Sequence, residues 1–166
     1  MTSAIPLGTA VVGLGEIKYA EKSGEELSCL GLGSCVAVSV WDPDHKRGGM
    51  AHVVLPERSA GRPPTPKFAD IAVPELIDTM VKKGARKSRL QIKLAGGAHM
   101  APAGAPKLPA MRIGNRNIEA VNAQLSKLGL KAKAEDLGGN KGRTVRLDVE
   151  SGQLVVSTAG MDKTNL

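Results

Sequence analysis

The sequence predicts an α+β fold in which a mixed or antiparallel β-sheet is covered by helices. Several short apolar stretches alternate as strands do, most of them follow one another across short turns, and two longer stretches carry an apolar stripe at helical spacing. A chain of 166 residues suits one domain, here residues 1–166. Aromatic residues make up only 2% of it, so we expect an aliphatic core.

Glycine separates the strands predicted in the N-terminal part. We expect strands at 9–15 ("TAVVGLG") and 15–21 ("GEIKYAE"). From Cys35 to Trp41 the residues on both faces are largely apolar, which predicts a central, covered strand. Residues 42–49 ("DPDHKRGG") then form a turn, and a second strand follows at 50–56.

Two amphipathic helices are predicted, at 67–83 and 115–128, each followed by a glycine that is suited to end it. Pro74 conflicts with the first helix, so that helix either begins near Asp70 or kinks at the proline. The remaining predicted strands cover residues 89–97, 130–137, 144–150 and 153–157. Residues 57–66 and 101–111 are predicted loops.

Composition limits the function classes. The formal net charge of +7 invites a polyanionic partner, but the basic residues are spread out and aromatic side chains for base stacking are almost absent. We therefore expect no nucleic acid partner, and a solvated basic face that would also suit an acidic protein. Neither a secretion signal nor a membrane span is visible. Two cysteines do not make a disulfide framework, which favours a cytoplasmic location.

Cys35 and His52 are the candidate catalytic pair. If the two strands pair as a hairpin around Pro43 and Asp44, residues whose numbers sum to 87 face each other, and Cys35 opposes His52. Directly opposed side chains share a face with their Cβ atoms about 4.5–5.5 Å apart. A bulge at Gly48 and Gly49 would shift this register.

The chemistry of such a pair is nucleophilic. A thiol with a pKa of about 8.5 is mostly protonated at neutral pH, and an imidazole can take its proton. The approach formed by Gly31, Gly33 and Ser34 lets backbone come close to a substrate, and its N–H groups could hold an oxyanion. A lone cysteine and a lone histidine are more often ordinary core and surface residues. A metal site would need more ligands than Cys29, Cys35 and His52 offer, so we expect no metal.

Several ordered motifs resemble the chemoreceptor glutamine deamidase family CheD. They are "LGLGSCVAVSVWDPDHKRGGMAHVVLP", "FADIAVPELIDTMVKKGA", "AGGAHM", "IGNRN" and "DLGGNKGRTVRLDVESG", and together they extend over nearly the whole chain. The resemblance implies a cysteine hydrolase that converts receptor glutamines to glutamates without a cofactor. It also implies a sheet sandwich flanked by helices, like the toxin deamidases typified by cytotoxic necrotizing factor. Cys35 matches the family nucleophile and His52 the family base.

The chain departs from the family at one catalytic position. The third family residue is a threonine six positions before the nucleophile, where this chain has Cys29. A thiol is a weak donor and acceptor for orienting an imidazole, and Ser28 on a strand would point the other way. Either Cys29 substitutes poorly, or another group orients His52, or the site is degenerate.

The resemblance also implies partners. These are methyl-accepting chemotaxis receptors and a CheC-type phosphatase of phosphorylated CheY, and some family members have methylesterase activity. We expect a monomer that does not insert into a membrane. The alternatives to an enzyme are a weakly active or non-catalytic regulator that binds receptors and CheC, and a redox sensor that uses Cys29 and Cys35. If both cysteines lie on one strand, they are about 20 Å apart, although a loop between them could close that gap.

Overall fold

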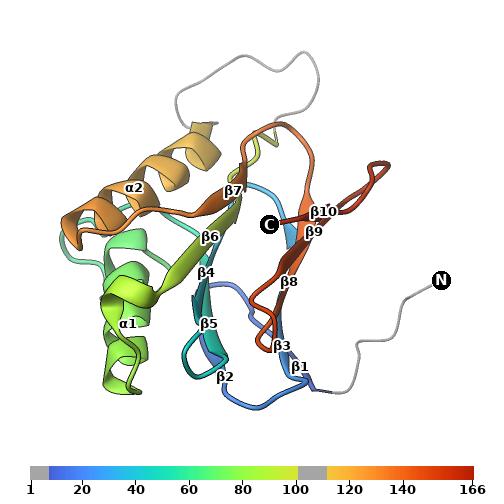
Figure 1. Cartoon of the computed structure of the whole chain (residues 1–166). Coiled ribbons are helices and arrows are strands. Elements are labelled where there is room, and N and C mark those ends of the chain that lie inside the picture. Colours follow the sequence, from blue (N-terminus) through green and yellow to red (C-terminus); the bar gives the residue numbers. More distant parts are fainter. Residues whose placement is uncertain (1–7, 101–111) are drawn as a thin grey trace.

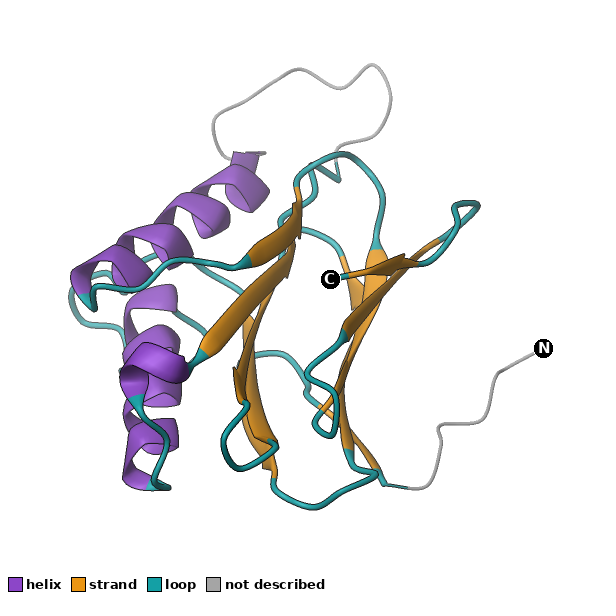
Figure 2. Ribbon diagram, viewed as in Figure 1, coloured by secondary structure: helices purple, strands orange, loops and turns teal. Residues whose placement is uncertain are grey.

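The structure, a computed structural model, describes residues 8–100 and 112–166. Two five-stranded sheets pack face to face, and both helices lie on the outer face of one sheet (Figures 1 and 2). The predicted α+β class with mixed sheets is confirmed, because each sheet contains one parallel pair among antiparallel ones. The predicted loop at 101–111 lies outside the described residues.

The sheet without helices has the order β1-β3-β8-β9-β10. Its strands are β1 (Thr9–Val11), β3 (Glu26–Leu32), β8 (Arg143–Asp148), β9 (Leu154–Thr158) and β10 (Thr164–Asn165). The sheet beneath the helices has the order β2-β5-β4-β6-β7. Its strands are β2 (Ile17–Ala20), β5 (Arg47–Val53), β4 (Val36–Asp42), β6 (Gln91–Gly96) and β7 (Ala134–Leu137).

The helices are α1 (Ala69–Lys82) and α2 (Ile113–Lys127), joined in sequence by a single 3-10 turn, η1 (Lys87–Arg89), and by β6. Helix α1 begins at Ala69, so Pro74 lies in its second turn. Of the two predicted alternatives, a start near Asp70 or a kink at Pro74, the structure adopts the start near Asp70. Both helices pack their buried faces on the β4 and β5 side of the molecule (Figure 1).

The sheet beneath the helices separates two clusters of buried apolar side chains. Val36, Val38 and Val40 point toward the helices, while Ala37 and Met50 point toward the other sheet. Both faces of β4 are apolar because both are covered by other layers, as the sequence predicts. The core is aliphatic, as the composition predicts.

Two features of the N-terminal half differ from the predictions. Strand β3 was not predicted, because its glycine-rich end resembles a loop, but it pairs with both β1 and β8. The turn between β4 and β5 covers only residues 43–46, since Gly48 and Gly49 belong to β5. A Cβ on Gly48 would lie 2.8 Å from Leu147 Cδ2, and one on Gly49 would lie 2.7 Å from Leu76 Cδ1. These glycines let both neighbouring layers approach the strand, and they do not form a bulge.

Candidate active site

Cys35 directly precedes β4, the middle strand of the sheet beneath the helices. It is half-buried and packs against the cluster between the two sheets. Its backbone carbonyl accepts a hydrogen bond of 2.8 Å from Gly97 N. A Cβ on Gly96 would collide with the same carbonyl, so glycine is required there for β6 to pass so close to Cys35.

His52 lies on β5 and is 4% exposed. Its ring Nδ1 is 3.0 Å from the carbonyl oxygen of Val12. Because a carbonyl can only accept, Nδ1 carries the proton and donates it, which leaves Nε2 as the acceptor in the neutral ring. Nε2 is buried and has no hydrogen-bond partner among the described residues.

The chain segment that contains Val12 also fixes the backbone of His52. His52 N donates to Glu16 O at 3.1 Å, and Gly15 N donates to His52 O at 3.0 Å. Val12 N in turn donates to Ser28 O at 2.7 Å, which ties this segment to β3. The loop between β1 and β2 therefore holds both the main chain and the ring of His52.

The predicted register of β4 and β5 is wrong by two residues. Ala37, and not Cys35, opposes His52, and the strand pairs have numbers that sum to 89. The physical reason is the tight turn at 43–46, which becomes possible because Gly48 and Gly49 pair within the strand. Since side chains alternate along a strand, a shift of two keeps Cys35 on the same face as His52, at a diagonal position.

The electrostatic environment of Cys35 favours a neutral thiol in the free protein. Burial raises the pKa of the Cys35 thiol, and the Cys35 amide N–H offsets part of that effect. A thiol that is neutral at rest must lose its proton to a base when a substrate arrives. The unpartnered Nε2 of His52, on the same face of the sheet, is the acceptor that the structure offers.

Cys29 is fully buried in β3 and faces the space between the sheets. Its sulfur lies 3.5 Å from the Met50 sulfur. Burial, and after it the negative charge that Cys35 carries once it ionises, raises the pKa of Cys29 to about 12. Cys29 is therefore a protonated core residue, and among the described residues no hydrogen bond joins it to the His52 ring. Ser28 bonds the Val145 carbonyl instead, at 2.9 Å, and does not replace the missing hydroxyl.

The two cysteines do not share one regular strand. Cys29 is within β3, whose pairing becomes irregular between Cys29 and Leu32, and Cys35 lies beyond the strand. The condition for a separation of about 20 Å, one strand that carries both cysteines, is therefore not met. Both side chains reach the same apolar cluster. Both thiols are free.

The glycine approach to Cys35 is backbone held in place by its neighbours. Gly31 N donates to Thr144 Oγ1 at 3.1 Å, so this N–H is already engaged. Gly33 O accepts from Ala98 N at 2.8 Å, and Ser34 O accepts from Asn117 Nδ2 at 2.9 Å.

Asn117 is a site residue that the sequence reasoning missed. It is 0% exposed on α2, and its Nδ2 donates to both Ser34 O and Val54 O, the latter at 3.0 Å. Its Oδ1 is buried without a partner among the described residues. The signal available in the sequence was a polar residue within the apolar stripe of α2, three positions after Gly114 and four before Val121.

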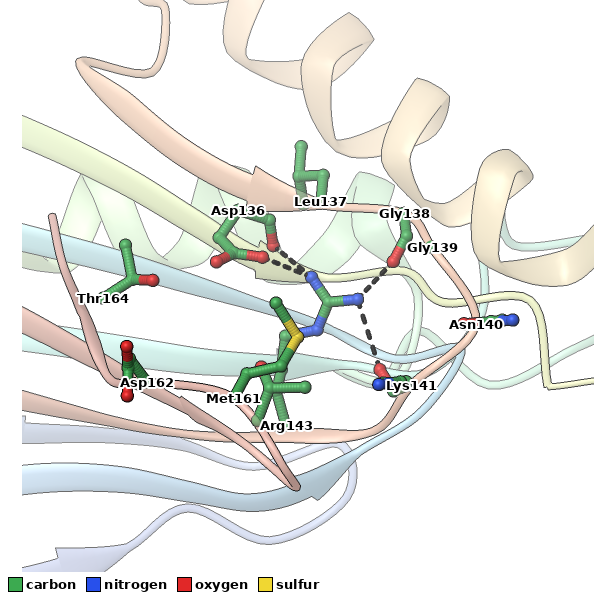
Figure 3. Close-up of a pocket in the computed structure, with 11 residues that line it drawn as sticks. Asp136, Leu137, Gly138, Gly139, Asn140, Lys141, Arg143, Met161, Asp162 and Thr164 are labelled. Carbon is green, nitrogen blue, oxygen red and sulfur yellow. Dashed lines mark hydrogen bonds and ion pairs between the residues drawn. The ribbon is translucent and has the colours of Figure 1, made fainter.

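A separate cavity of about 290 Å³ lies between two segments: the end of β7 with the loop that follows it, and the end of β9 with the loop that leads to β10 (Figure 3). Arg143 lies at its base and donates to the Asp136 carboxylate at 2.5 Å and to the carbonyls of Gly138 and Lys141. Its lining includes neither Cys35 nor His52. The described residues contain no group of three or more metal-ligating side chains, and none of their helices is long and apolar enough to cross a membrane.

Fold and site define a class of protein: a two-sheet α+β sandwich in which a half-buried cysteine and a histidine share one face of a sheet, and the histidine Nε2 is buried without a partner among the described residues. The model of the family described as CheD chemotactic sensory transduction matches residues 54–158. The chain belongs to the CheD family, as the resemblance predicts. Cys35 and His52 precede the matched segment, so full-length relatives are needed to cover them.

Two relatives match the chain over a length that includes both residues. One, named probable chemoreceptor glutamine deamidase CheD, from Symbiobacterium thermophilum, is 45% identical over 158 residues, 93% of this chain and 95% of that relative. Another, named chemoreceptor glutamine deamidase CheD, from Thermotoga maritima, is 45% identical over 151 residues, 90% of this chain and 92% of that relative. Each match covers at least 90% of this chain, so the uncovered residues are too few to reach from either end to Cys35 or His52.

Among solved structures, a hypothetical protein YfiH from Bacillus licheniformis matches 72% of this chain and 49% of its own, with 13% identity and a TM-score of 0.47. This likeness is too distant to define the fold family. The toxin-type deamidase fold implied by the resemblance stays a prediction, as does the division of the chain into one domain.

Proposed function

We propose that this chain is a protein-glutamine deamidase that converts glutamines of methyl-accepting chemotaxis receptors to glutamates, with Cys35 as nucleophile and His52 as base. One observation carries the proposal: His52 donates through Nδ1 to Val12 and keeps a free Nε2 on the face of the sheet that also bears Cys35. Family membership and the names of the two relatives support the substrate class.

The reaction follows from these groups. Nε2 of His52 takes the Cys35 proton, and the sulfur attacks the side-chain carboxamide carbon to form a tetrahedral oxyanion. The Cys35 N–H is the first donor for that oxyanion, because it belongs to the same residue as the attacking sulfur. Protonated His52 then gives its proton to the leaving nitrogen, and ammonia departs with formation of a thioester.

Water completes the cycle. His52 removes a proton from water, which attacks the thioester carbon, and the sulfur leaves and is reprotonated by the imidazolium. The net change is amide plus water to carboxylate plus ammonium, so no oxidant or cofactor enters the balance. Gly31, Gly33 and Ser34 serve as the open backbone surface against which the glutamine side chain lies.

The Val12 carbonyl takes the place of the family threonine in this proposal. A group that bonds Nδ1 fixes the tautomer and the ring orientation, which is the task of the third residue in a cysteine or serine triad. Cys29 then serves as packing. Of the three interpretations that the sequence left open, the structure favours the one in which another group orients His52.

Receptor fragments test the proposal. The fragment is incubated with wild-type protein or with Cys35→Ala, and ammonia release is measured while peptide mapping locates each Gln→Glu conversion. We expect conversion at a small set of glutamines with wild type and none with Cys35→Ala. Binding of the receptor without conversion by wild type would support the non-catalytic regulator instead.

We also propose a CheC-type phosphatase as a second partner, a cytoplasmic location and a monomeric state. Family membership supports the partner, and two free cysteines suit a reducing compartment. Size-exclusion chromatography with light scattering, with and without the phosphatase, tests the partner and the monomer. A dimer mass for the isolated chain would contradict the monomer.

A further inference from the structure

We propose that Asn117 is a positioning residue for the deamidation site, because its single amide nitrogen joins the segment that carries Cys35 to the strand that carries His52. The proposal rests on the proposed function for its chemistry. It goes beyond that function by assigning a role to a helix residue that touches neither the sulfur nor the imidazole.

The geometry is a two-way clamp. Asn117 Nδ2 donates at 2.9 Å to the carbonyl of Ser34, the residue directly before Cys35. The same nitrogen donates at 3.0 Å to the carbonyl of Val54, two residues after His52. Both partners are carbonyl oxygens, so the nitrogen must be the atom that faces them, and both of its hydrogens are used. The relative position of the two segments is therefore fixed through one side chain.

The burial of Asn117 argues for a demanding role. The side chain is fully buried, and its Oδ1 has no partner among the described residues. A buried amide with an unpaired oxygen destabilises a fold compared with an apolar residue of the same shape. Packing alone therefore gives no reason for asparagine at this position, whereas bridging two main-chain carbonyls does.

The bond to Ser34 also acts on the reacting sulfur. The Ser34 carbonyl, which accepts from Asn117, and the Cys35 N–H belong to the same peptide unit. The Cys35 backbone N–H lowers the pKa of the Cys35 thiol and so offsets part of the effect of burial. Donation to a peptide carbonyl polarises the unit and strengthens its N–H as a donor. Asn117 thereby strengthens the main-chain group that stabilises the thiolate, in addition to holding Cys35 in place.

The glycines around the clamp let α2 come close enough to form it. A Cβ on Gly114 would lie 2.6 Å from the Gly97 carbonyl, and one on Gly97 would lie 2.5 Å from Ile118 Cδ1. Gly97 N in turn donates to the Cys35 carbonyl. The first turns of α2 are therefore packed directly on the backbone that surrounds the nucleophile.

The test compares Asn117→Ala and Asn117→Asp with wild type. Asn117→Asp keeps the shape and removes the amide donors. The matched control is Gln124→Ala, which removes another buried polar side chain of α2, two turns from Asn117, without removing the hydrogen bonds to Ser34 and Val54. Three quantities are measured: the pH profile of Cys35 alkylation by chloroacetamide, kcat and KM on a receptor fragment, and hydrogen exchange at residues 33–36 and 52–55.

We expect both Asn117 variants to lose about 10–100-fold in kcat with KM changed by less than about threefold, as misplacement of reacting groups does. We expect their alkylation profiles to move to higher pH and their exchange to rise at the two segments, with no such changes in Gln124→Ala. Folded variants with a wild-type alkylation profile and unchanged kcat would overturn the proposal. Equal losses in Gln124→Ala, or unfolding of both Asn117 variants, would also count against it.

Alkylation keeps the two proposals separable, because it reports on Cys35 without any receptor. A shifted profile in the Asn117 variants, together with no receptor deamidation by wild type, would defeat the proposed function and leave the positioning role standing. An unshifted profile with normal wild-type turnover would do the reverse.

Discussion

Replacing Cys29 by threonine restores the family residue and tests what orients His52. If Cys29 were a poor substitute in that role, threonine would raise the rate greatly. The loss of the orienting acid from a serine protease triad, for comparison, lowers kcat by about 10⁴-fold. In this structure Nδ1 of His52 already donates to Val12 at 3.0 Å, so the position to be filled is occupied. We therefore expect Cys29→Thr to change kcat by less than about threefold.

The stability of the same variant should fall. Cys29 is 0% exposed, and its sulfur lies against the Met50 sulfur, which is a weak hydrogen-bond acceptor. A buried hydroxyl without a good partner costs about 1–3 kcal/mol. For a chain of this length that corresponds to a decrease in Tm of about 2–12 °C. Cys29→Val, which has the shape of threonine without the hydroxyl, is the matched control and should retain more stability.

The assay measures initial rates of glutamine conversion in a receptor fragment for wild type, Cys29→Thr and Cys29→Val, with thermal unfolding of each. We predict similar rates for all three and the lowest Tm for Cys29→Thr. A gain of tenfold or more that appears with threonine and not with valine would refute the reasoning. It would show that the hydroxyl orients His52 and that the Val12 carbonyl does not suffice.

Three further predictions concern the base, a buried thiol and a buried ion pair. His52→Gln should lower kcat by about 10²–10⁴-fold with little change in KM, and an unchanged rate in a coupled ammonia assay would remove His52 as the base. The pKa of Cys29 is about 12 in the folded state, above the ordinary thiol range, so the folded state holds a proton that the unfolded chain releases. Its contribution to stability is complete below about pH 9 and is lost as pH rises toward 12, by about 1.4 kcal/mol per pH unit. Urea titrations should show a shallower slope in Cys29→Ala than in wild type. The slope that remains in Cys29→Ala includes that of Cys35, whose pKa burial also raises. Arg143→Met should lower the free energy of unfolding by about 2–4 kcal/mol in the same titrations. This is below the full value for a buried ion pair because the Asp136 side chain is 30% exposed. A loss under about 0.5 kcal/mol would contradict the structural role of the guanidinium.

Local patterns predict the parts of the fold in which side chains alternate regularly. The alternation over 144–149 corresponds to β8, and the two apolar stripes correspond to α1 and α2. Strand β3 escaped prediction because glycines at its end hide the alternation of Leu27 and Cys29, which becomes visible only beside β8. Gly48 and Gly49 lie within β5 because side chains from the neighbouring layers pack directly against them. The register of β5 therefore depends on contacts between distant parts of the chain, which local patterns do not reveal.

The candidate site divides in the same way. Cys35 and His52 are reactive side chains, so residue type and family motifs identify them. The Val12 carbonyl is main chain and carries no signature in the sequence, although it is the partner that fixes the His52 tautomer. Asn117 comes from a helix more than sixty residues after His52, and only the packing of α2 on the sheet brings it to Ser34 and Val54.

The thioester on Cys35 is the most direct evidence for the central claim. Wild-type protein and a receptor fragment are mixed, quenched in acid during turnover and analysed by mass spectrometry of the Cys35 peptide, with hydroxylamine added to half of each sample. The account predicts a receptor peptide attached to Cys35 that hydroxylamine releases, and no adduct with Cys35→Ala. Continued deamidation by Cys35→Ala, or an adduct on Cys29 in place of Cys35, would contradict it.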